Sequence, residues 1–117
     1  GAEWFPGAVL NYAENILAKA KPGQPALVHL NERQPATEMS WDDLASQVRR
    51  LATALRALGV ERGDRVAIML DPSLAFYGAL FGAVRRGAVA VPLFTLFGPD
   101  GVRLRVQDCN PAMSFFP

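Results

Sequence analysis

The sequence has little of what many catalytic and metal sites are built from. Its 117 residues include one cysteine, Cys109, and one histidine, His29. A single cysteine excludes an intrachain disulfide and a metal site made of several cysteines. A single histidine, with no catalytic or metal-binding partners around it, is more typical of an ordinary strand residue. We therefore interpret His29 as a strand residue without a role, and Cys109 as a small packed residue near a helix end.

Strong charge and long apolar runs are also missing. Twelve basic and eleven acidic residues give a formal net charge of +1, which gives no support for a nucleic-acid partner. The pair Arg49-Arg50 is interpreted as a solvated helix face. The longest nearly apolar run, Leu74–Val84, is far shorter than the roughly 20 residues that cross a bilayer. Because the first residues also lack the pattern of a secretory signal, we expect a cytoplasmic protein without membrane contact.

The composition is that of one folded domain spanning residues 1–117. Half of the residues are hydrophobic, and the length suits a single core. In residues 1–40 we expect a lead-in helix over Leu10–Leu17, capped by Asn11, and then a hairpin of strands Ala26–Leu30 and Ala36–Met39. Residues 41–117 are expected to form a core of alternating strands and helices.

The clearest helix prediction covers Trp41–Leu58. Its apolar residues recur every three or four positions, which places them on one face. Ser40 is a suitable N-cap, and Met39 and Leu44 hold the two positions of a hydrophobic staple. Gly59 suits the left-handed conformation that ends a helix.

Three short apolar segments read as buried strands: Val66–Leu70, Ala88–Val91 and Met113–Phe116. A helix over Leu74–Arg86 joins the first two, and a helix beginning at Gly98-Pro99 precedes the third. This order predicts an α/β fold, with a partial doubly wound, mainly parallel sheet, flanking helices and an N-terminal hairpin. Helices 41–58 and 74–86 are expected to pack on the sheet. The spacing of Gly78 and Gly82 is interpreted as allowing close contact between helix and sheet.

In such sheets, ligands bind at the carboxyl ends of the strands. Here those ends lead into Asp71-Pro72-Ser73 and Leu93-Phe94-Thr95. The residues alone leave two interpretations of Phe94, Thr95 and Leu96 open, a packing loop or the wall of a ligand site. Their position at the strand end favours the ligand wall.

Several short motifs, in order, carry a resemblance to a known family. Residues 40–44, Ser-Trp-Asp-Asp-Leu, are similar to a Thr-Tyr-x-Glu-Leu motif, with Asp43 in place of the glutamate. Residues 86–93, Arg-Gly-Ala-Val-Ala-Val-Pro-Leu, are similar to Ala-Gly-Ala-x-Tyr-Val-Pro-Leu. Residues 63–66, Gly-Asp-Arg-Val, match the strand between them, and residues 4–15 resemble the lead-in of acetyl- and acetoacetyl-CoA synthetases. The chain thus resembles the N-terminal portion of an AMP-forming acyl-CoA synthetase of the adenylate-forming superfamily.

The resemblance implies a parent ligase that uses ATP, CoA and Mg²⁺. A small carboxylic acid would be activated to an acyl-adenylate and then transferred to the CoA thiol. The family's phosphate loop and catalytic lysine have no counterpart here, so the segment alone is expected to be inactive and to bind neither ATP nor metal. The remainder of the parent chain would be its partner, and the bare segment is expected to self-associate.

The resemblance also implies one binding segment. Phe94, Thr95 and Leu96 align with a Phe-Gly-Gly stretch that lies beside CoA in acetyl-CoA synthetases. Thr95 and Leu96 replace the glycines, as in medium-chain or aryl acid ligases. Two alternatives remain: a ligase that uses another acceptor, such as a carrier protein, and a free-standing flavodoxin-like or receiver-like binding domain.

Overall fold

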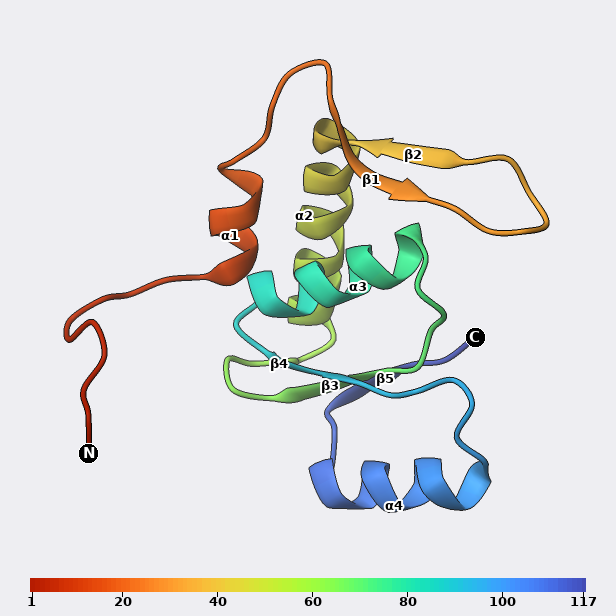
Figure 1. Cartoon of the computed structure of the whole chain (residues 1–117). Helices are drawn as coiled ribbons and strands as arrows, with labels where there is room; N and C mark the ends of the chain where they lie inside the picture. Colours follow the sequence, from red (N-terminus) through yellow and green to blue (C-terminus); the bar gives the residue numbers. More distant parts are fainter.

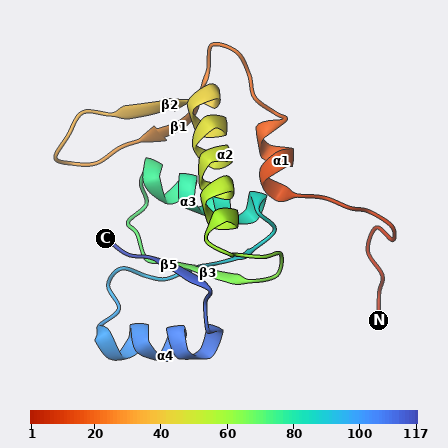
Figure 2. The ribbon, with the colours of Figure 1, turned by 180° about the vertical axis from the view of Figure 1, so that it is seen from behind.

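A three-stranded parallel sheet lies between two helical layers in the computed structural model, which describes all residues 1–117 (Figure 1). Along the chain the elements are α1 (Tyr12–Leu17), β1 (Pro25–His29), β2 (Thr37–Ser40), α2 (Trp41–Ala57), β3 (Arg65–Ile68), α3 (Leu74–Arg85), β4 (Val89–Pro92), α4 (Pro99–Cys109) and β5 (Met113–Phe115). Helices α2 and α3 lie on one side of the sheet and α4 lies on the other, as the view from behind also shows (Figure 2).

The parallel sheet has the strand order β4-β3-β5. Its central residue Val66 pairs with Ala90 on one side and with Met113 on the other, and Val66 is fully buried. The chain moves from β3 outward to β4, and then back across β3 to β5. A constant crossover handedness therefore requires α3 and α4 to lie on opposite faces, as they do. The predicted α/β class and the parallel pairing of the three strands are confirmed.

The predicted hairpin is also confirmed, as a separate antiparallel pair of β1 and β2. It leads directly into α2, where the Ser40 hydroxyl accepts a hydrogen bond from the Asp43 amide at 3.1 Å. Met39 and Leu44, the two staple residues, are buried together with Val48 in a small second core. The staple fixes the angle at which the hairpin enters the helix.

Both long helices end in the same way. At the end of α2, Gly59 has φ +89°, and the Val60 amide donates to the Leu55 carbonyl at 2.9 Å. At the end of α3, Gly87 has φ +86°, and the amide that follows it donates to the Ala83 carbonyl at 3.0 Å. These are Schellman ends, in which a left-handed glycine lets the next apolar residue fold back onto the helix. Each therefore turns the chain toward the amino end of a sheet strand.

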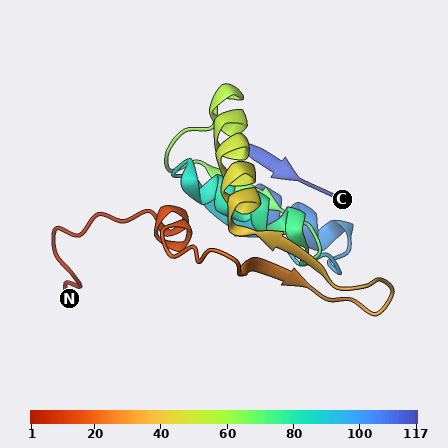
Figure 3. The same cartoon turned by 90° about the horizontal axis from the view of Figure 1, so that it is seen from above.

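The main core differs in one respect from the sequence-based expectation. Its buried members are Leu55, Val60, Val66, Ile68, Ala79, Ala83 and Ala88. Helix α3 supplies two of them and lies directly on the sheet, whereas α2 supplies only Leu55. Seen from above, α2 crosses over α3 (Figure 3). The expectation that both helices pack on the sheet was therefore wrong for most of α2, because the small residues of α3 let α2 pack there instead.

Gly78 and Gly82 serve this helix–helix contact and not the predicted helix–sheet contact. A Cβ atom at Gly82 would lie 2.6 Å from Leu51 Cβ, and one at Gly78 would lie 2.5 Å from Gln47 Oε1. Both neighbours belong to α2. The face of α3 that meets the sheet is instead formed by Ala79 and Ala83.

Most predicted boundaries agree with the structure to within one or two residues. The first sheet strand ends at Ile68 and not at Leu70, and α2 and α3 each end one residue earlier than predicted. Helix α4 begins at Pro99 as predicted, but none of its residues is buried. None of the helices combines the length and the apolar character that crossing a membrane requires.

The contact between α2 and α3 yields a stability prediction. Gly82→Ala should lower the free energy of unfolding by about 1–2 kcal/mol, because overpacking costs about 1–3 kcal/mol and the alanine returns up to about 1 kcal/mol in helix propensity. Urea denaturation would measure the change. Gly78→Ala should be milder, since the atom it meets is the movable end of the Gln47 side chain.

Gly101→Ala in α4 is the matched control, because the nearest atoms to its Cβ would lie at an ordinary 3.5 Å. A Gly82→Ala protein as stable as the Gly101→Ala protein would show that α2 and α3 do not meet this closely.

Candidate functional site

The carboxyl ends of β3 and β4 meet at one edge of the sheet. The Thr95 hydroxyl, after β4, donates a hydrogen bond to Asp71 Oδ1, after β3, at 2.8 Å. The two strand-end segments singled out in the sequence are therefore adjacent, as their parallel pairing requires. This bond ties together the loops that form the predicted ligand edge.

The loop after β4 presents apolar side chains to solvent. Phe94 is 60% exposed and Leu96 is 80% exposed, while Thr95 between them is half-buried. The ring of Phe94 meets Phe97 edge-on at 5.7 Å, and the Arg105 guanidinium lies 3.7 Å from the centre of the Phe97 ring. Contacts of Thr95 and Phe97 thus hold the loop in place. The exposed side chains of Phe94 and Leu96 remain free to contact a ligand. Such a surface can line a ligand but offers no group for proton transfer.

The same edge does not fit a nucleotide triphosphate. Segment Asp71-Pro72-Ser73 contains no glycine, Pro72 has no N–H, and the Ser73 hydroxyl already accepts from the Phe76 amide at 3.2 Å. A phosphate cradle needs free backbone amides in a glycine-rich turn. No group of three or more histidine, cysteine, aspartate or glutamate side chains is placed to hold a metal ion. The carboxyl edge of the sheet therefore does not fit the phosphates of ATP.

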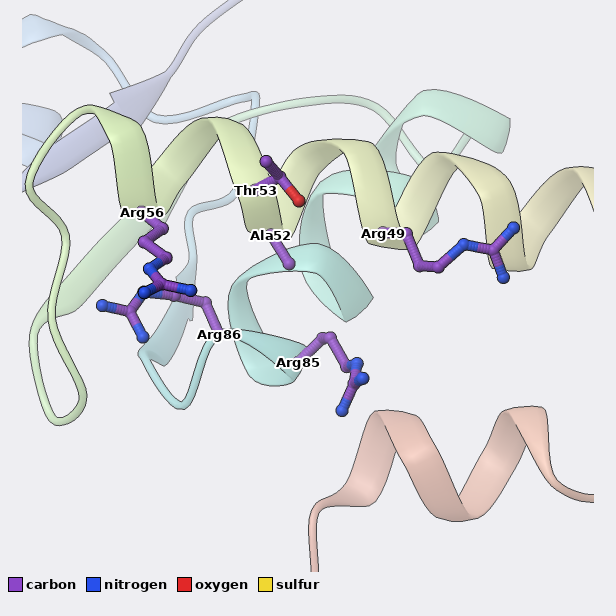
Figure 4. A pocket seen from close by; sticks show the side chains of 6 residues that line it. All are labelled: Arg49, Ala52, Thr53, Arg56, Arg85 and Arg86. Carbon is purple, nitrogen blue, oxygen red and sulfur yellow. The ribbon is translucent and has the colours of Figure 1, made fainter.

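A second candidate site lies at the other end of α3, in a cavity of about 310 Å³ (Figure 4). It is lined by Arg49, Ala52, Thr53 and Arg56 of α2 and by Arg85 and Arg86 at the end of α3. Four of its six lining residues carry a guanidinium group, and none carries a carboxylate.

Sequence reasoning missed this pocket. It treated Arg49-Arg50 as a solvated face, and both side chains are indeed exposed. However, Arg50 donates to Ser46 Oγ at 3.1 Å and lines a different cavity, whereas Arg49 lines the arginine pocket. Arg49 and Arg56 are about two helical turns apart, which places them on the same face of the helix. This spacing was the one sign of the pocket in the sequence. The crossing of α2 over α3, which adds the other two arginines, was not visible in the sequence.

Residues 16–116 match the family model described as AMP-binding enzyme. The chain belongs to this family. Among curated relatives, the chain is 35% identical to acetoacetyl-CoA synthetase of Mus musculus, with 97% of the chain and 17% of the relative covered. It is 34% identical to acetyl-coenzyme A synthetase 2 of Pseudomonas putida, with 93% and 18% covered.

The fold of the chain agrees with a solved structure of an acetoacetyl-CoA synthetase. The structure of acetoacetyl-CoA synthetase from Streptomyces lividans superposes with a TM-score of 0.90 at 40% identity, and 98% of the chain and 18% of that protein are covered. The resemblance to AMP-forming acyl-CoA synthetases is thereby confirmed. The chain spans less than a fifth of the length of each of these proteins.

Proposed function

We propose that this chain is part of an acid–CoA ligase. The ligase activates a small carboxylic acid with ATP to an acyl-adenylate, releases pyrophosphate, and then transfers the acyl group to the CoA thiol. One observation carries the proposal: nearly the whole chain superposes on the acetoacetyl-CoA synthetase from S. lividans at 40% identity. The shared elements include the parallel sheet whose carboxyl edge is the usual ligand side of such folds.

In this proposal the chain contributes a binding surface, and the rest of the ligase contributes the catalytic residues. The carboxyl edge has no phosphate cradle and the chain has no metal cluster, so ATP and Mg²⁺ belong to residues elsewhere in the ligase. The remainder of the ligase is then the partner of this chain.

The contribution assigned to the chain itself is a wall for CoA, formed by Phe94, Thr95 and Leu96. Phe94 and Leu96 are exposed and apolar, and Thr95 holds the loop to Asp71. The arm of CoA that carries the thiol is long and partly apolar, and it gains free energy by lying against such side chains. Thr95 and Leu96 carry side chains where the acetyl-CoA synthetase motif has glycines, so they leave less space for CoA beside this wall.

Leu96→Trp in the full gene product tests this assignment. The added bulk should lower CoA-dependent turnover about tenfold or more, as steric misplacement of a bound substrate does. Adenylate formation, measured as pyrophosphate exchange in the absence of CoA, should change little.

Leu58→Trp is the control, because Leu58 is equally apolar, is 67% exposed and lies at the end of α2, near the opposite edge of the sheet. Equal losses in both half-reactions, or no loss in a folded protein, would make the segment a packing loop and remove the CoA assignment.

The same proposal predicts how Mg-ATP binds. A calorimetric titration of residues 1–117 alone should show no binding, because no loop in the chain is built to hold the phosphates. The full gene product should bind saturably under the same conditions. If residues 1–117 bound Mg-ATP with a micromolar dissociation constant while their circular-dichroism spectrum showed a folded protein, the assignment of ATP binding to the rest of the ligase would be wrong.

We also propose that residues 1–117 self-associate when the rest of the ligase is absent. The apolar character of Leu74–Val84 and of Phe115-Phe116 suggests such a surface. No large apolar side chain of Leu74–Val84 is exposed, but Phe116 is 52% exposed, and Trp4 and Leu96 are each 80% exposed. Sedimentation velocity should show mass increasing with concentration. A monomer at all concentrations, with the fold retained, would refute this.

A further inference from the structure

The arginine pocket, lined by Arg49, Arg56, Arg85 and Arg86 between α2 and α3, is not part of the proposed ligase chemistry. It lies where α3 ends and β4 begins, which is the amino edge of the sheet. We propose that this pocket binds a phosphate group. The ligand class is a free phosphate or pyrophosphate ion, and not a magnesium-bound nucleotide.

Two of the four arginines are held in place by the protein. Arg86 Nε donates to the Val60 carbonyl at 2.8 Å, which leaves both terminal nitrogens of its guanidinium group without a protein partner. Arg85 forms an ion pair with Glu14 of α1, and in Figure 4 its side chain is directed toward that helix. Since these two groups are already positioned, a phosphate bound here would not have to order them.

The other two arginines are unpaired. Arg49 and Arg56 form no ion pair and no side-chain hydrogen bond within the protein. Figure 4 shows Arg49 toward one end of the pocket and Arg56 with Arg86 toward the other. Glu14 is the only carboxylate paired with any of the four, so the pocket keeps an excess of positive charge. An excess of positive charge around one cavity favours an anion there.

The end of α3 does not cancel this charge. The carbonyls of a helix C-terminus are partly negative and repel anions. Here the Val84 carbonyl already accepts from the Gly87 amide at 2.9 Å and from Asn11 Nδ2 at 2.7 Å. The helix end is therefore neutralised by amides, and the arginines are not needed to satisfy it.

The chemistry of guanidinium selects phosphate. Its planar fork matches two phosphate oxygens at once, and arginines on two elements can share the three or four oxygens of one group. Thr53, which also lines the pocket, adds a hydroxyl donor. A cavity of about 310 Å³ has room for a diphosphate.

The test is calorimetric titration of the full gene product with inorganic pyrophosphate and, separately, with AMP. The wild-type protein should bind pyrophosphate in an event that weakens as salt is raised. In the R49Q/R56Q protein the affinity of that event should fall about tenfold or more, because two charged donors are lost. Pyrophosphate should bind this site more tightly than AMP does, and tighter binding of AMP would overturn the assignment to the free ion.

The R33Q/R50Q protein is the matched control. It removes the same charge from exposed positions outside the pocket, and it should bind as the wild type does. If both variants bound pyrophosphate equally more weakly, the attraction would come from overall charge and not from the pocket. The proposal would also be wrong if R49Q/R56Q changed no pyrophosphate-binding event.

If R49Q/R56Q instead lowers the melting temperature of the full product without changing pyrophosphate binding, the arginines pair with an acidic segment of the protein, and the phosphate assignment is wrong. Loss of CoA-dependent turnover is not a readout here, so failure of the ligase proposal and failure of this one can be told apart.

Discussion

The close contact between α2 and α3 is the constraint on which the rest of the structure depends. At Gly82 the backbone of α3 comes so near Leu51 that even a methyl group would not fit without movement. The two helices can pack this closely only because α3 has small residues on two faces: glycines toward α2, and Ala79 and Ala83 toward the sheet. Helix α3 is therefore the middle layer of a stack. A bulkier helix there would separate α2 from the core and expose Leu55.

That stacking has two consequences at opposite edges of the sheet. At the amino edge, it brings arginines from two helices around one cavity, with α1 paired to one of them through Glu14. At the carboxyl edge, the loops after β3 and β4 are joined by the bond between Thr95 and Asp71. The first edge is charged and partly fixed, whereas the second is apolar and open. The charged amino edge and the apolar carboxyl edge therefore suit two different ligands.

Local features were predictable from the sequence, and the contacts between distant elements were not. Ser40, Met39 and Gly59 act within a few residues of their own position, so their roles as cap, staple and helix stop could be inferred from the chain. The parallel sheet followed from apolar strands separated by helices. The position of α2 did not follow, because an apolar stripe indicates that a helix packs but not against what. The arginine pocket was missed for the same reason, whereas the position of Phe94–Leu96 at the carboxyl edge was predictable because it depends only on strand direction.

Asn11 joins segments that are distant in the sequence. Its side-chain oxygen accepts from the Glu14 amide and begins α1, while its side-chain nitrogen donates to the carbonyl of Val84, 73 residues further along. A helix of six residues is too short to persist alone in water. Helix α1 therefore depends on α3 already being in place. At roughly 5–20 residues per second of synthesis, α1 waits several seconds for its support, and it is among the last of these elements to become ordered.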